Sequence, residues 1–506
     1  MERINFDQAQ ALHSVAATRA MEAAAASSLP AHALMQRAGA ACARLALALA
    51  PHARHVWIAC GSGNNGGDGL EAAAWLHQAG KNVSVTWPGA PETAPPDAHA
   101  AWQRAVAAGV VFAPGPPPGL GPHDLCIDAL LGIGLRSQAD APRMPPTALH
   151  ALLRQLRTSP ATLLAVDLPS GLDADTGQYA AGFAPDAEEA AASTARHTLS
   201  LLTLKPGLFT AQGRDACASL WHDDLQCGAF APAATAELSG GRQPDARKAR
   251  APHDSHKGSF GDVAVIGGEG LQARGMGMTG AAWLAASAAL HGGAGRVMVA
   301  LLDDGQTLAP PWPELMLRRV DALDWPQVTA VCGCGGGEAV RAVLPTVLAQ
   351  AARLVLDADG LNAVASDNAL AAALRQRAHA GLPTVLTPHP LEAARLLQCT
   401  AAQVQADRLA AAQALAERYA CSVVLKGSGS IIATPGQLPR INPTGNARLA
   451  TAGTGDVLAG LIGARLAQGL APHAAACSAV LAHGAAADHW PDDRSLTASA
   501  LAAFLQ

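Results

Sequence analysis

The stretch that decides how the chain folds near its end is Asn442-Pro-Thr-Gly-Asn-Ala-Arg-Leu-Ala-Thr-Ala-Gly-Thr-Gly-Asp-Val-Leu-Ala-Gly460. Its core is Gly453-Thr-Gly-Asp456, and apolar residues follow from Val457 with helical spacing. A glycine turn that opens a helix presents free backbone N–H groups, which bind anions such as phosphate. Asp456 would then handle a proton while the N–H groups hold the charge. The alternative is that Asp456 only caps the helix.

Length and composition restrict the class of protein. The chain has 506 residues, half of them hydrophobic, so we expect two or more domains with large cores. The net charge is −5 and no basic run is present, which argues against nucleic acid as a partner. The 10 cysteines show neither zinc spacing nor a disulfide framework, and reduced, buried thiols are expected.

The N-terminal residues 1–7 lack the basic-then-apolar pattern of a signal peptide. The apolar segment 40–50 is too short to span a bilayer and contains Arg44. We therefore expect a soluble, cytoplasmic protein with no membrane partner.

In the first half, an apolar strand at 55–60 leads into Gly61-Ser-Gly-Asn-Asn-Gly-Gly-Asp-Gly69, and a helix is expected over 70–79. A strand, a glycine loop and a helix form the geometry that holds a phosphate or a dinucleotide. The two asparagines and Asp68 add polar side chains that a dinucleotide fingerprint does not need. The stretch therefore indicates a nucleotide site with additional chemistry.

Two further apolar strands, at 124–128 and 162–167, each end in an aspartate. Strands and helices alternate here, which predicts a parallel sheet with its ligand at the carboxyl ends of the strands. Asp68, Asp128 and Asp167 would converge at that edge, and such a cluster indicates a cation, a shared proton or a polar ligand. Each aspartate alone could instead cap the turn after its strand, and Ser170 could be an ordinary turn residue.

Residues 10–220 resemble the epimerase domain of the NAD(P)H-hydrate repair enzymes in three motifs: Asn64-Asn-Gly-Gly-Asp-Gly69, Asp128-Ala-Leu-Leu-Gly132 and Val166-Asp-Leu-Pro-Ser-Gly-Leu172. The resemblance implies proton transfer by Asp167, and K⁺ bound by Asn65, Asp128 and Ser170. One departure is Ile133, where the family usually has threonine. The residues that the resemblance places at the hydrated nicotinamide nucleotide are Asn64, Asn65, Gly66, Gly67, Asp68, Gly132, Ile133, Gly134, Leu135, Arg136, Ser137, Gln138 and Asp167.

Residues 228–256 are rich in alanine, proline, glycine and mixed charge without periodicity, which predicts a linker with a boundary near 235. We expect one domain over 1–230 and a second over 240–506. The second half again alternates strands with helices, and its strands end in glycines, acids or Lys426. It is therefore a second α/β domain.

Residues 250–505 resemble the ribokinase-like superfamily and, within it, the ADP- or ATP-dependent NAD(P)H-hydrate dehydratases. The motifs are Lys257-Gly-Ser-Phe-Gly261, Asp357-Ala-Asp-Gly-Leu-Asn362, Thr387-Pro-His389, Lys426-Gly427 and the stretch from Gly445 to Asp456. The resemblance implies contacts to the adenine nucleotide from Lys426, Gly427, Ser428, Gly429, Ser430, Gly453, Thr454 and Gly455. It implies contacts to the hydrated substrate from Ala281, Gly335, Gly337, His389 and Asp456.

At two positions this half departs from the residues usual in the family, and at a third a structural role is the alternative. Leu391 stands where the family usually has glycine, and Ser430 replaces a usual threonine but keeps the hydroxyl. For His389 the alternative is a structural histidine that caps its helix.

The resemblance predicts two three-layer αβα domains, N-terminal Rossmann-like and C-terminal ribokinase-like. The expected function is repair of hydrated NADH and NADPH: epimerisation of the R and S forms, and dehydration of the S form with ADP or ATP and Mg²⁺. Phosphorylation turns the hydroxyl on carbon 6 into a good leaving group, with Asp456 accepting its proton and the N–H groups of 453–455 stabilising the phosphoryl charge. A homo-oligomer is expected.

Two alternatives remain at this point. One is a vitamin-precursor kinase with an accessory nucleotide-binding domain, because such kinases share the Gly-Thr-Gly-Asp turn. The other is a nucleotide sensor without chemistry, against which Asp167, Lys426 and Asp456 argue. The sequence leaves open ADP against ATP and NADH against NADPH.

Overall fold

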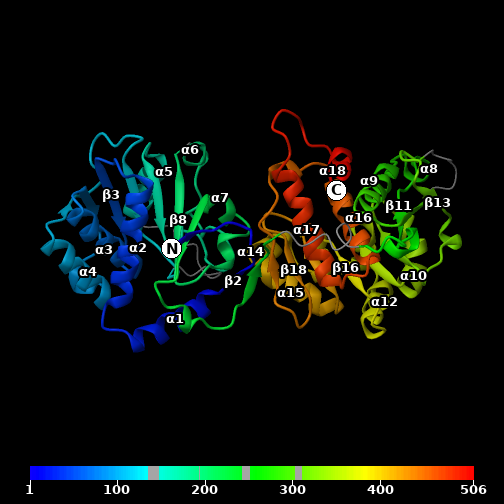
Figure 1. Ribbon diagram of the computed structural model, residues 1–506, viewed down its shortest axis with the longest axis horizontal. Coiled ribbons are helices and arrows are strands. Elements are labelled where there is room, and N and C mark those ends of the chain that lie inside the picture. The colour runs from blue at the N-terminus through cyan, green and yellow to red at the C-terminus, as the bar shows by residue number, and fades with distance from the viewer. Residues whose placement is uncertain (135–146, 193, 242–250, 303–309, 506) are drawn as a thin grey trace. The chain divides into compact units, whose positions relative to one another are not determined.

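The computed structural model describes residues 1–134, 147–192, 194–241, 251–302 and 310–505. The chain forms two compact units, one of Met1–Asn5 with Gln10–Ala236 and the other of Phe6–Ala9 with Glu237–Gln506. Each unit contains a β-sheet with helices on both faces (Figure 1). The α/β class with three layers in each half is therefore confirmed. The domain limits at 230 and 240 stay a prediction, and the short segment Phe6–Ala9 groups with the second unit.

The sheet of the first unit has the strand order β1-β9-β8-β7-β6-β3-β4-β5. Its neighbouring strands pair in parallel, except that β1 is antiparallel to β9 at one edge. The strands are β1 (Glu2–Arg3), β3 (His55–Cys60), β4 (Asn82–Thr86), β5 (Val111–Phe112), β6 (Leu125–Ala129), β7 (Thr162–Val166), β8 (Arg196–Leu201) and β9 (Ser219–Asp223). The helices are α1 (Val15–Ser28), α2 (Ala33–Leu49), α3 (Asn64–Gln78), α4 (Pro96–Ala107), α5 (Thr147–Thr158), α6 (Ala187–Ala191) and α7 (Gly213–Cys217).

Strand β3 shows why this sheet reads as continuous apolar runs. Val56, Ile58 and Cys60 belong to a core shared with α2, α3 and α4, whereas Trp57 and Ala59 belong to a second core shared with α5. Successive side chains of a strand point to opposite faces, and both faces of this sheet are covered. Both faces of β3 are therefore apolar.

Helix α3 begins at Asn64, six residues earlier than the helix that the sequence predicts from Leu70. Glycine is needed at Gly66 and Gly67 because neighbouring segments approach the helix closely, and not because the backbone forms a loop there. A Cβ at Gly66 would lie 1.9 Å from the Gly61 carbonyl oxygen, and one at Gly67 would lie 2.6 Å from the Met35 side chain. The asparagines of the motif therefore stand in the first turn of the helix.

The sheet of the second unit runs β13-β12-β11-β14-β15-β16-β17-β18-β19-β10. Pairing is parallel from β13 to β17, whereas β18 is antiparallel to both β17 and β19. This antiparallel part is not predicted by the sequence. The strands are β10 (Ala236–Leu238), β11 (Asp262–Gly267), β12 (Arg296–Leu301), β13 (Met316–Leu317), β14 (Val328–Cys332), β15 (Arg353–Leu356), β16 (Thr384–Leu386), β17 (Ser422–Leu425), β18 (Ile431–Ala433) and β19 (Arg440–Ile441).

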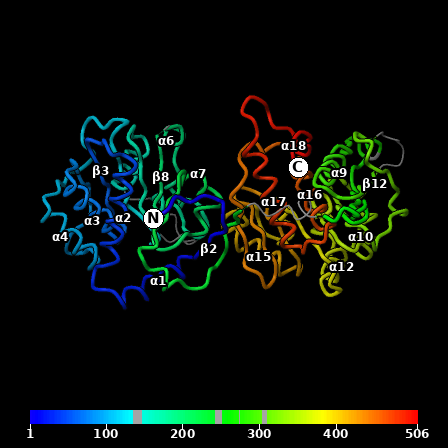
Figure 2. The backbone as a smooth tube through the Cα atoms, viewed as in Figure 1, coloured from blue at the N-terminus to red at the C-terminus, as the bar shows by residue number. Residues whose placement is uncertain are grey.

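Helices cover both faces of the second sheet, and the chain alternates between strand and helix along most of its course (Figure 2). Helices α9, α16, α17 and α18 share one core with Val263, Val299 and Val331 of the sheet. No helix in the described ranges is long and apolar enough to cross a membrane. The helices are α8 (Leu271–Arg274), α9 (Thr279–His291), α10 (Val340–Gln350), α11 (Ala358–Ser366), α12 (Asn368–His379), α13 (Pro390–Leu397), α14 (Ala401–Ala406), α15 (Arg408–Tyr419), α16 (Thr454–Ala467), α17 (Pro472–Asp488) and α18 (Ala498–Phe504).

Candidate active sites

The Gly453-Thr-Gly-Asp456 turn opens helix α16, as the sequence predicts. Gly453 has φ 91°, in the left-handed region that glycine adopts without steric cost. The Thr454 hydroxyl donates to the carbonyl oxygens of Leu449 (2.8 Å) and Thr451 (2.9 Å), which fixes the turn. Within the described residues, no hydrogen bond is recorded for the backbone N–H groups of Gly455 and Asp456. These N–H groups are therefore available to an anion.

Three strands bring further groups to this turn. The Cys334 sulfur and the carboxylate oxygens of Asp357 and Asp456 all lie within 4.8 Å of one another. The Lys426 ammonium donates to Asp357 Oδ1 at 2.8 Å, and a Cβ added at Gly455 would lie 3.4 Å from the same ammonium. A cation, two carboxylates and the anion-binding turn thus meet at the carboxyl ends of β14, β15 and β17.

The charges of this cluster set the protonation of Asp456. Burial, and then the negative charge of Asp357, raise the pKa of the Asp456 carboxyl to about 7, while the Cys334 thiol and Lys426 oppose the shift. Burial alone would lower the pKa of Lys426, but Asp357 and Glu392 outweigh it and raise that pKa. Asp456 therefore exchanges a proton near neutral pH, as a general base requires.

The turn Lys426–Ser430 joins β17 to β18. The Ser430 hydroxyl accepts from Gly427 N (3.3 Å) and donates to Gly427 O (3.1 Å). These two hydrogen bonds close the turn, and they need only the hydroxyl that Ser430 shares with the usual threonine. The buried Arg408 donates to the carbonyl oxygens of Leu425 (3.3 Å) and Lys426 (3.2 Å), at the start of the turn. Burial lowers the pKa of Arg408 to about 10. Arg408 was not among the predicted residues, since a helical arginine reads as a surface residue.

His389 caps helix α13, which is the structural alternative that the sequence left open. Its Nδ1 accepts from the N–H groups of Leu391 (3.1 Å) and Glu392 (3.2 Å), and its Nε2 lies 3.2 Å from Glu392 Oε1. Glu392 is buried, and burial raises its pKa to about 7. The ring remains half exposed, so capping and a substrate contact are compatible.

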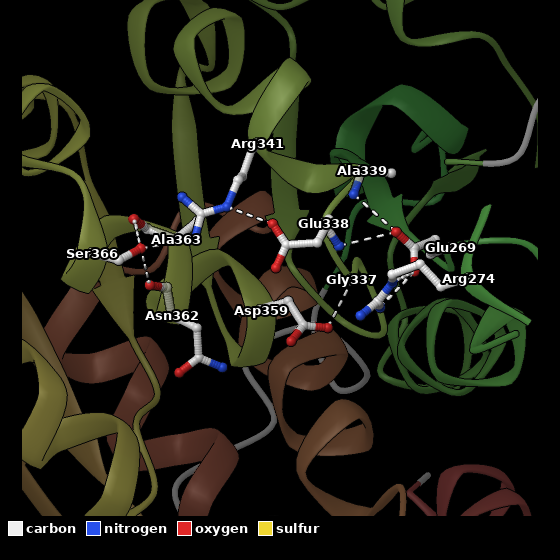
Figure 3. Close-up of polar contacts among 10 residues, drawn as sticks. All are labelled: Glu269, Arg274, Gly337, Glu338, Ala339, Arg341, Asp359, Asn362, Ala363 and Ser366. Carbon is white, nitrogen blue, oxygen red and sulfur yellow. Dashed lines mark hydrogen bonds and ion pairs between the residues drawn. The ribbon is translucent and has the colours of Figure 1, made fainter. Parts of the chain in front are cut away.

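The remaining predicted substrate residues of this unit lie together. A Cβ added at Gly335 would lie 2.9 Å from the Ala281 Cβ and 2.4 Å from the Met278 carbonyl oxygen, so no larger residue fits there. Figure 3 shows that the Gly337 end of this loop is held by Asp359 and that the start of α10 is held by Glu269. Asp359 belongs to the motif 357–362 that the sequence singled out, whereas Glu269 was not among the predicted residues.

His483 on α17 is a second residue that the sequence analysis missed. It is buried, and its Nε2 donates to the Thr454 carbonyl oxygen at 3.0 Å. Burial lowers the pKa of His483 to about 4, so the ring is neutral near pH 7 and supports the phosphate turn without adding charge. Its only sequence signal is a histidine inside an alanine-rich helical run.

In the first unit, Asp167 follows β7 with φ 66°, a strained conformation for a residue with a side chain. Its carboxylate accepts a hydrogen bond from the fully buried Lys205 ammonium and one from Leu201 N at 3.3 Å. Lys205 also donates to Ser200 Oγ (3.2 Å) and Leu201 O (2.7 Å). All three ammonium hydrogens are therefore used, and Asp167 is held in one orientation. Lys205 was not among the predicted residues, although the stretch Thr203-Leu-Lys-Pro-Gly207 also resembles a late segment of the epimerase domain.

Helix α1 also reaches the Asp167 site. Thr18 shares a buried hydroxyl–hydroxyl hydrogen bond with Thr203 (2.7 Å), and Arg19 donates to the Ile133 carbonyl oxygen (3.3 Å). Burial, and then Asp167, raise the pKa of Glu22. Burial, and then Asp167 and Glu22, raise the pKa of Asp68 well above its usual range. Three carboxylates and Lys205 therefore share this site, and Glu22 is an addition to the predicted set.

Asp128 and Ser170, two of the three predicted K⁺ ligands, are in direct contact. Asp128 accepts from Ser170 N (2.9 Å) and from the Ser170 hydroxyl (2.6 Å), and burial raises its pKa. The third, Asn65, lies against Gly132, where an added Cβ would be 3.0 Å from Asn65 Oδ1. The Asn65 Nδ2 is buried and has no hydrogen-bond partner among the described residues.

Gly132, Ile133 and Gly134 follow β6 near these groups, whereas Leu135, Arg136, Ser137 and Gln138 lie outside the described residues. Asn64, Gly66 and Gly67 form the first turns of α3 beside them. In each half, the predicted residues that the structure describes thus gather at one edge of the sheet.

Comparison with known proteins matches each half of the chain to a family. The family described as "YjeF-related protein N-terminus" matches residues 31–207, and the family described as "NAD(P)H-hydrate dehydratase" matches residues 263–505. The chain is 36% identical over 487 residues to the bifunctional NAD(P)H-hydrate repair enzyme Nnr of Escherichia coli, covering 92% of this chain and 87% of the relative.

This chain belongs to the bifunctional NAD(P)H-hydrate repair enzyme family.

The second half alone has further relatives. It is 44% identical over 269 residues to the ADP-dependent (S)-NAD(P)H-hydrate dehydratase of Neisseria meningitidis, covering 52% of this chain and 87% of that protein. A crystal structure of the ADP/ATP-dependent NAD(P)H-hydrate dehydratase from Bacillus subtilis, co-crystallised with ATP/Mg²⁺, is 31% identical and covers 51% of this chain and 91% of that one, with a TM-score of 0.42.

Proposed function

We propose that this chain repairs hydrated NADH and NADPH with two activities: its first unit epimerises the R and S forms, and its second unit dehydrates the S form. Membership of the bifunctional family over 92% of the chain carries this proposal. The family matches cover both halves, which argues against a vitamin-precursor kinase with an unrelated accessory domain.

Dehydration proceeds through phosphoryl transfer from ADP or ATP to the hydroxyl on carbon 6. Asp456 accepts the hydroxyl proton, while the N–H groups of Gly455 and Asp456 and the Lys426 ammonium stabilise charge on the phosphoryl group. Phosphate then leaves from carbon 6, and a proton leaves the neighbouring ring carbon to restore the double bond. The products are NAD(P)H, phosphate and AMP or ADP, so water is in effect transferred to the nucleotide.

Epimerisation needs no phosphate donor: carbon 6 carries both the hydroxyl and the ring nitrogen, so a protonated hydroxyl can leave as water, and water can add back to either face and lose a proton. Asp167 is the proton-transfer group, and Lys205 orients its carboxylate through the buried ion pair. The hydrated nicotinamide nucleotide binds along Asn64–Asp68 and residues 132–138. Asp68 and Glu22 keep their protons more readily than ordinary carboxyls, so they hydrogen-bond the ligand without adding full negative charge.

The residues predicted for K⁺ suit that ion. Asp128, Ser170 and Asn65 offer oxygen atoms with a single formal charge, whereas Mg²⁺ in proteins is usually bound by one or two carboxylates together with phosphate oxygens. The unpartnered amide edge of Asn65 would present its oxygen after a 180° flip of the side chain. A bound K⁺ would offset the phosphate charge of the ligand. Mg²⁺ accompanies ADP or ATP in the second unit and neutralises their phosphates.

One incubation tests the function. Purified full-length protein is given a mixture of R- and S-hydrated NADH with ADP, with ATP and without nucleotide, and NADH absorbance is followed. We expect complete conversion of both epimers with a nucleotide and no NADH formation without one. NADH formation that stops near half of the substrate would remove the epimerase assignment, and no NADH with either nucleotide would remove the dehydratase assignment.

Two expectations concern the protein as a whole. A homo-oligomer follows from the resemblance to the ribokinase-like superfamily, and its test is the mass in light scattering. A cytoplasmic location is the second expectation, and cell fractionation tests it.

A further inference from the structure

The glycine turn after β14 differs from an ordinary phosphate-binding turn because protein groups already bind its N–H groups. Gly336 N donates to Gly333 O at 3.0 Å, and Gly337 N donates to Asp359 Oδ2 at 2.8 Å. Glu338 N and Ala339 N both donate to Glu269 Oε1, at 2.9 and 3.0 Å. Two carboxylates therefore occupy the positions that an anionic ligand would take (Figure 3).

Glu269 connects three segments of the substrate side of the second unit. It is 1% exposed and lies two residues after the end of β11, and its own N–H donates to Gly335 O at 2.7 Å. Its carbonyl oxygen accepts from Met278 N at 2.9 Å, at the start of the helix that carries Ala281. Its carboxylate accepts from Arg274 Nε at 2.7 Å. The backbone and the side chain of one residue thus fix both Gly335 and the approach to Ala281.

The charge of Glu269 is part of this arrangement. Burial raises the pKa of Glu269, but the hydrogen bonds from Arg274, Ala339 and Glu338 outweigh burial and lower it, so the carboxylate is ionised. Charge-assisted hydrogen bonds of this kind are stronger than neutral ones. No room is left beside it, since a Cβ at Gly337 would lie 2.2 Å from Glu269 Oε2.

We propose that Glu269 is a positioning residue of the dehydratase: it shapes the Gly335–Gly337 turn for an uncharged part of the hydrated dinucleotide, the ring or a ribose, and keeps phosphate off that turn. The inference rests on the proposed function, which places the substrate there. The phosphate donor is left to the Gly453–Asp456 turn, where the N–H groups of Gly455 and Asp456 have no recorded partner among the described residues.

The test uses full-length Glu269→Ala and Glu269→Gln, with KM and kcat measured separately for S-hydrated NADH and for ADP. Glu269→Ala removes the oxygen that accepts from two N–H groups and also removes the Arg274 partner. We expect the KM for hydrated NADH to rise about tenfold or more while the KM for ADP changes less than about twofold. Glu269→Gln keeps an acceptor oxygen for Glu338 and Ala339. Its KM for hydrated NADH should therefore lie between the values of the unmodified protein and of Glu269→Ala.

The matched control is Asp321→Asn, which removes the same charge from the exposed ion pair of Asp321 with Arg319 and should change neither KM. An unchanged KM for hydrated NADH in both Glu269 variants overturns the proposal. So does an equal rise in the KM for ADP, because that result describes a general structural role. Absence of turnover in the unmodified protein would instead reject the proposed function, so the two failures are distinguishable.

Discussion

The two predicted proton-transfer aspartates, Asp167 and Asp456, stand at equivalent edges of two sheets but differ in their lysine partner. In the first unit the fully buried Lys205 bonds Asp167 itself. In the second unit Lys426 bonds the neighbouring Asp357 at 2.8 Å, and Asp456 is left with a pKa of about 7. The ammonium group therefore contacts the proton-transfer aspartate itself in the first unit, and the neighbour of that aspartate in the second.

The surrounding backbone fits this difference. Asp456 lies in the first turn of α16, where the N–H groups of the helix start favour a bound anion. Asp167 lies in a strained turn and bonds Leu201 N, away from a helix start. The proton-transfer aspartate thus lies in the anion-binding turn of a helix start only in the second unit, in agreement with the nucleotide requirement proposed for dehydration alone.

The largest expected effect comes from Asp456→Asn. The variant keeps the shape of the turn but cannot accept the hydroxyl proton, so dehydration should fall by about two to four orders of magnitude. Epimer interconversion, followed by chromatography without nucleotide, should be unchanged. Asp167→Asn is the matched control and should show the opposite pattern. Near-normal dehydration by Asp456→Asn would remove Asp456 as the base.

Lys205→Met removes the ion pair between Lys205 and Asp167 in the first unit. It leaves the Asp167 carboxylate buried without its cation, which costs about 3–5 kcal/mol of unfolding free energy. Denaturant unfolding of the full chain should show a destabilised first transition, together with a loss of epimerase activity. Adding Asp167→Asn should restore part of the stability but not the activity. Full additivity of the two variants would show that the ion pair has no energetic coupling.

The pH dependence of dehydration sharpens the comparison further. Asp456 acts as a base only when deprotonated, and its pKa is about 7, so kcat/KM should rise with pH through that region. Asp357→Asn removes the second largest cause of the raised pKa and frees Lys426 to approach Asp456. Both effects lower the pKa, so the rise should move to lower pH. The measurement is kcat/KM against pH with saturating nucleotide, and a rise that stays in place or moves upward contradicts this account.

The sequence predicted the groups that carry chemistry better than the groups that hold them. Asp456, Lys426, Asp128 and Asp167 follow strands or open a helix, and period-two and helical patterns locate such positions from local residues alone. Lys205 and Glu269 act through partners that are distant along the chain, and each stands in a stretch where a charged residue normally faces solvent.

The glycine motif at residues 61–69 shows a different limit. The sequence predicted a loop there because glycines usually mark turns. The structure continues α3 through Gly66 and Gly67, because Gly61 and Met35 approach the helix too closely for any side chain. Close approach between distant segments leaves the same sequence signature as backbone flexibility, so the start of the helix could not be located.

The smallest expected effect concerns the K⁺ proposed for the first unit. The cation proposed for the second unit is instead Mg²⁺, bound together with the nucleotide. Asp128 is the single formal charge among the predicted ligands, and its bonds to Ser170 hold two of the three ligands together whether or not an ion is bound. K⁺ would therefore tune the ligand affinity of a preformed site, so epimerisation should be faster in K⁺ than in Na⁺ or Li⁺ and should not require Mg²⁺. The rates are measured at equal ionic strength with a chelator present, and dehydration by the same protein, supplied with Mg²⁺, is the internal control. Asp128→Ala should lower the epimerase rate and abolish its preference for K⁺. Equal rates in the three salts, with a fully active Asp128→Ala, would return Asp128 to the role of a cap for the turn after β6.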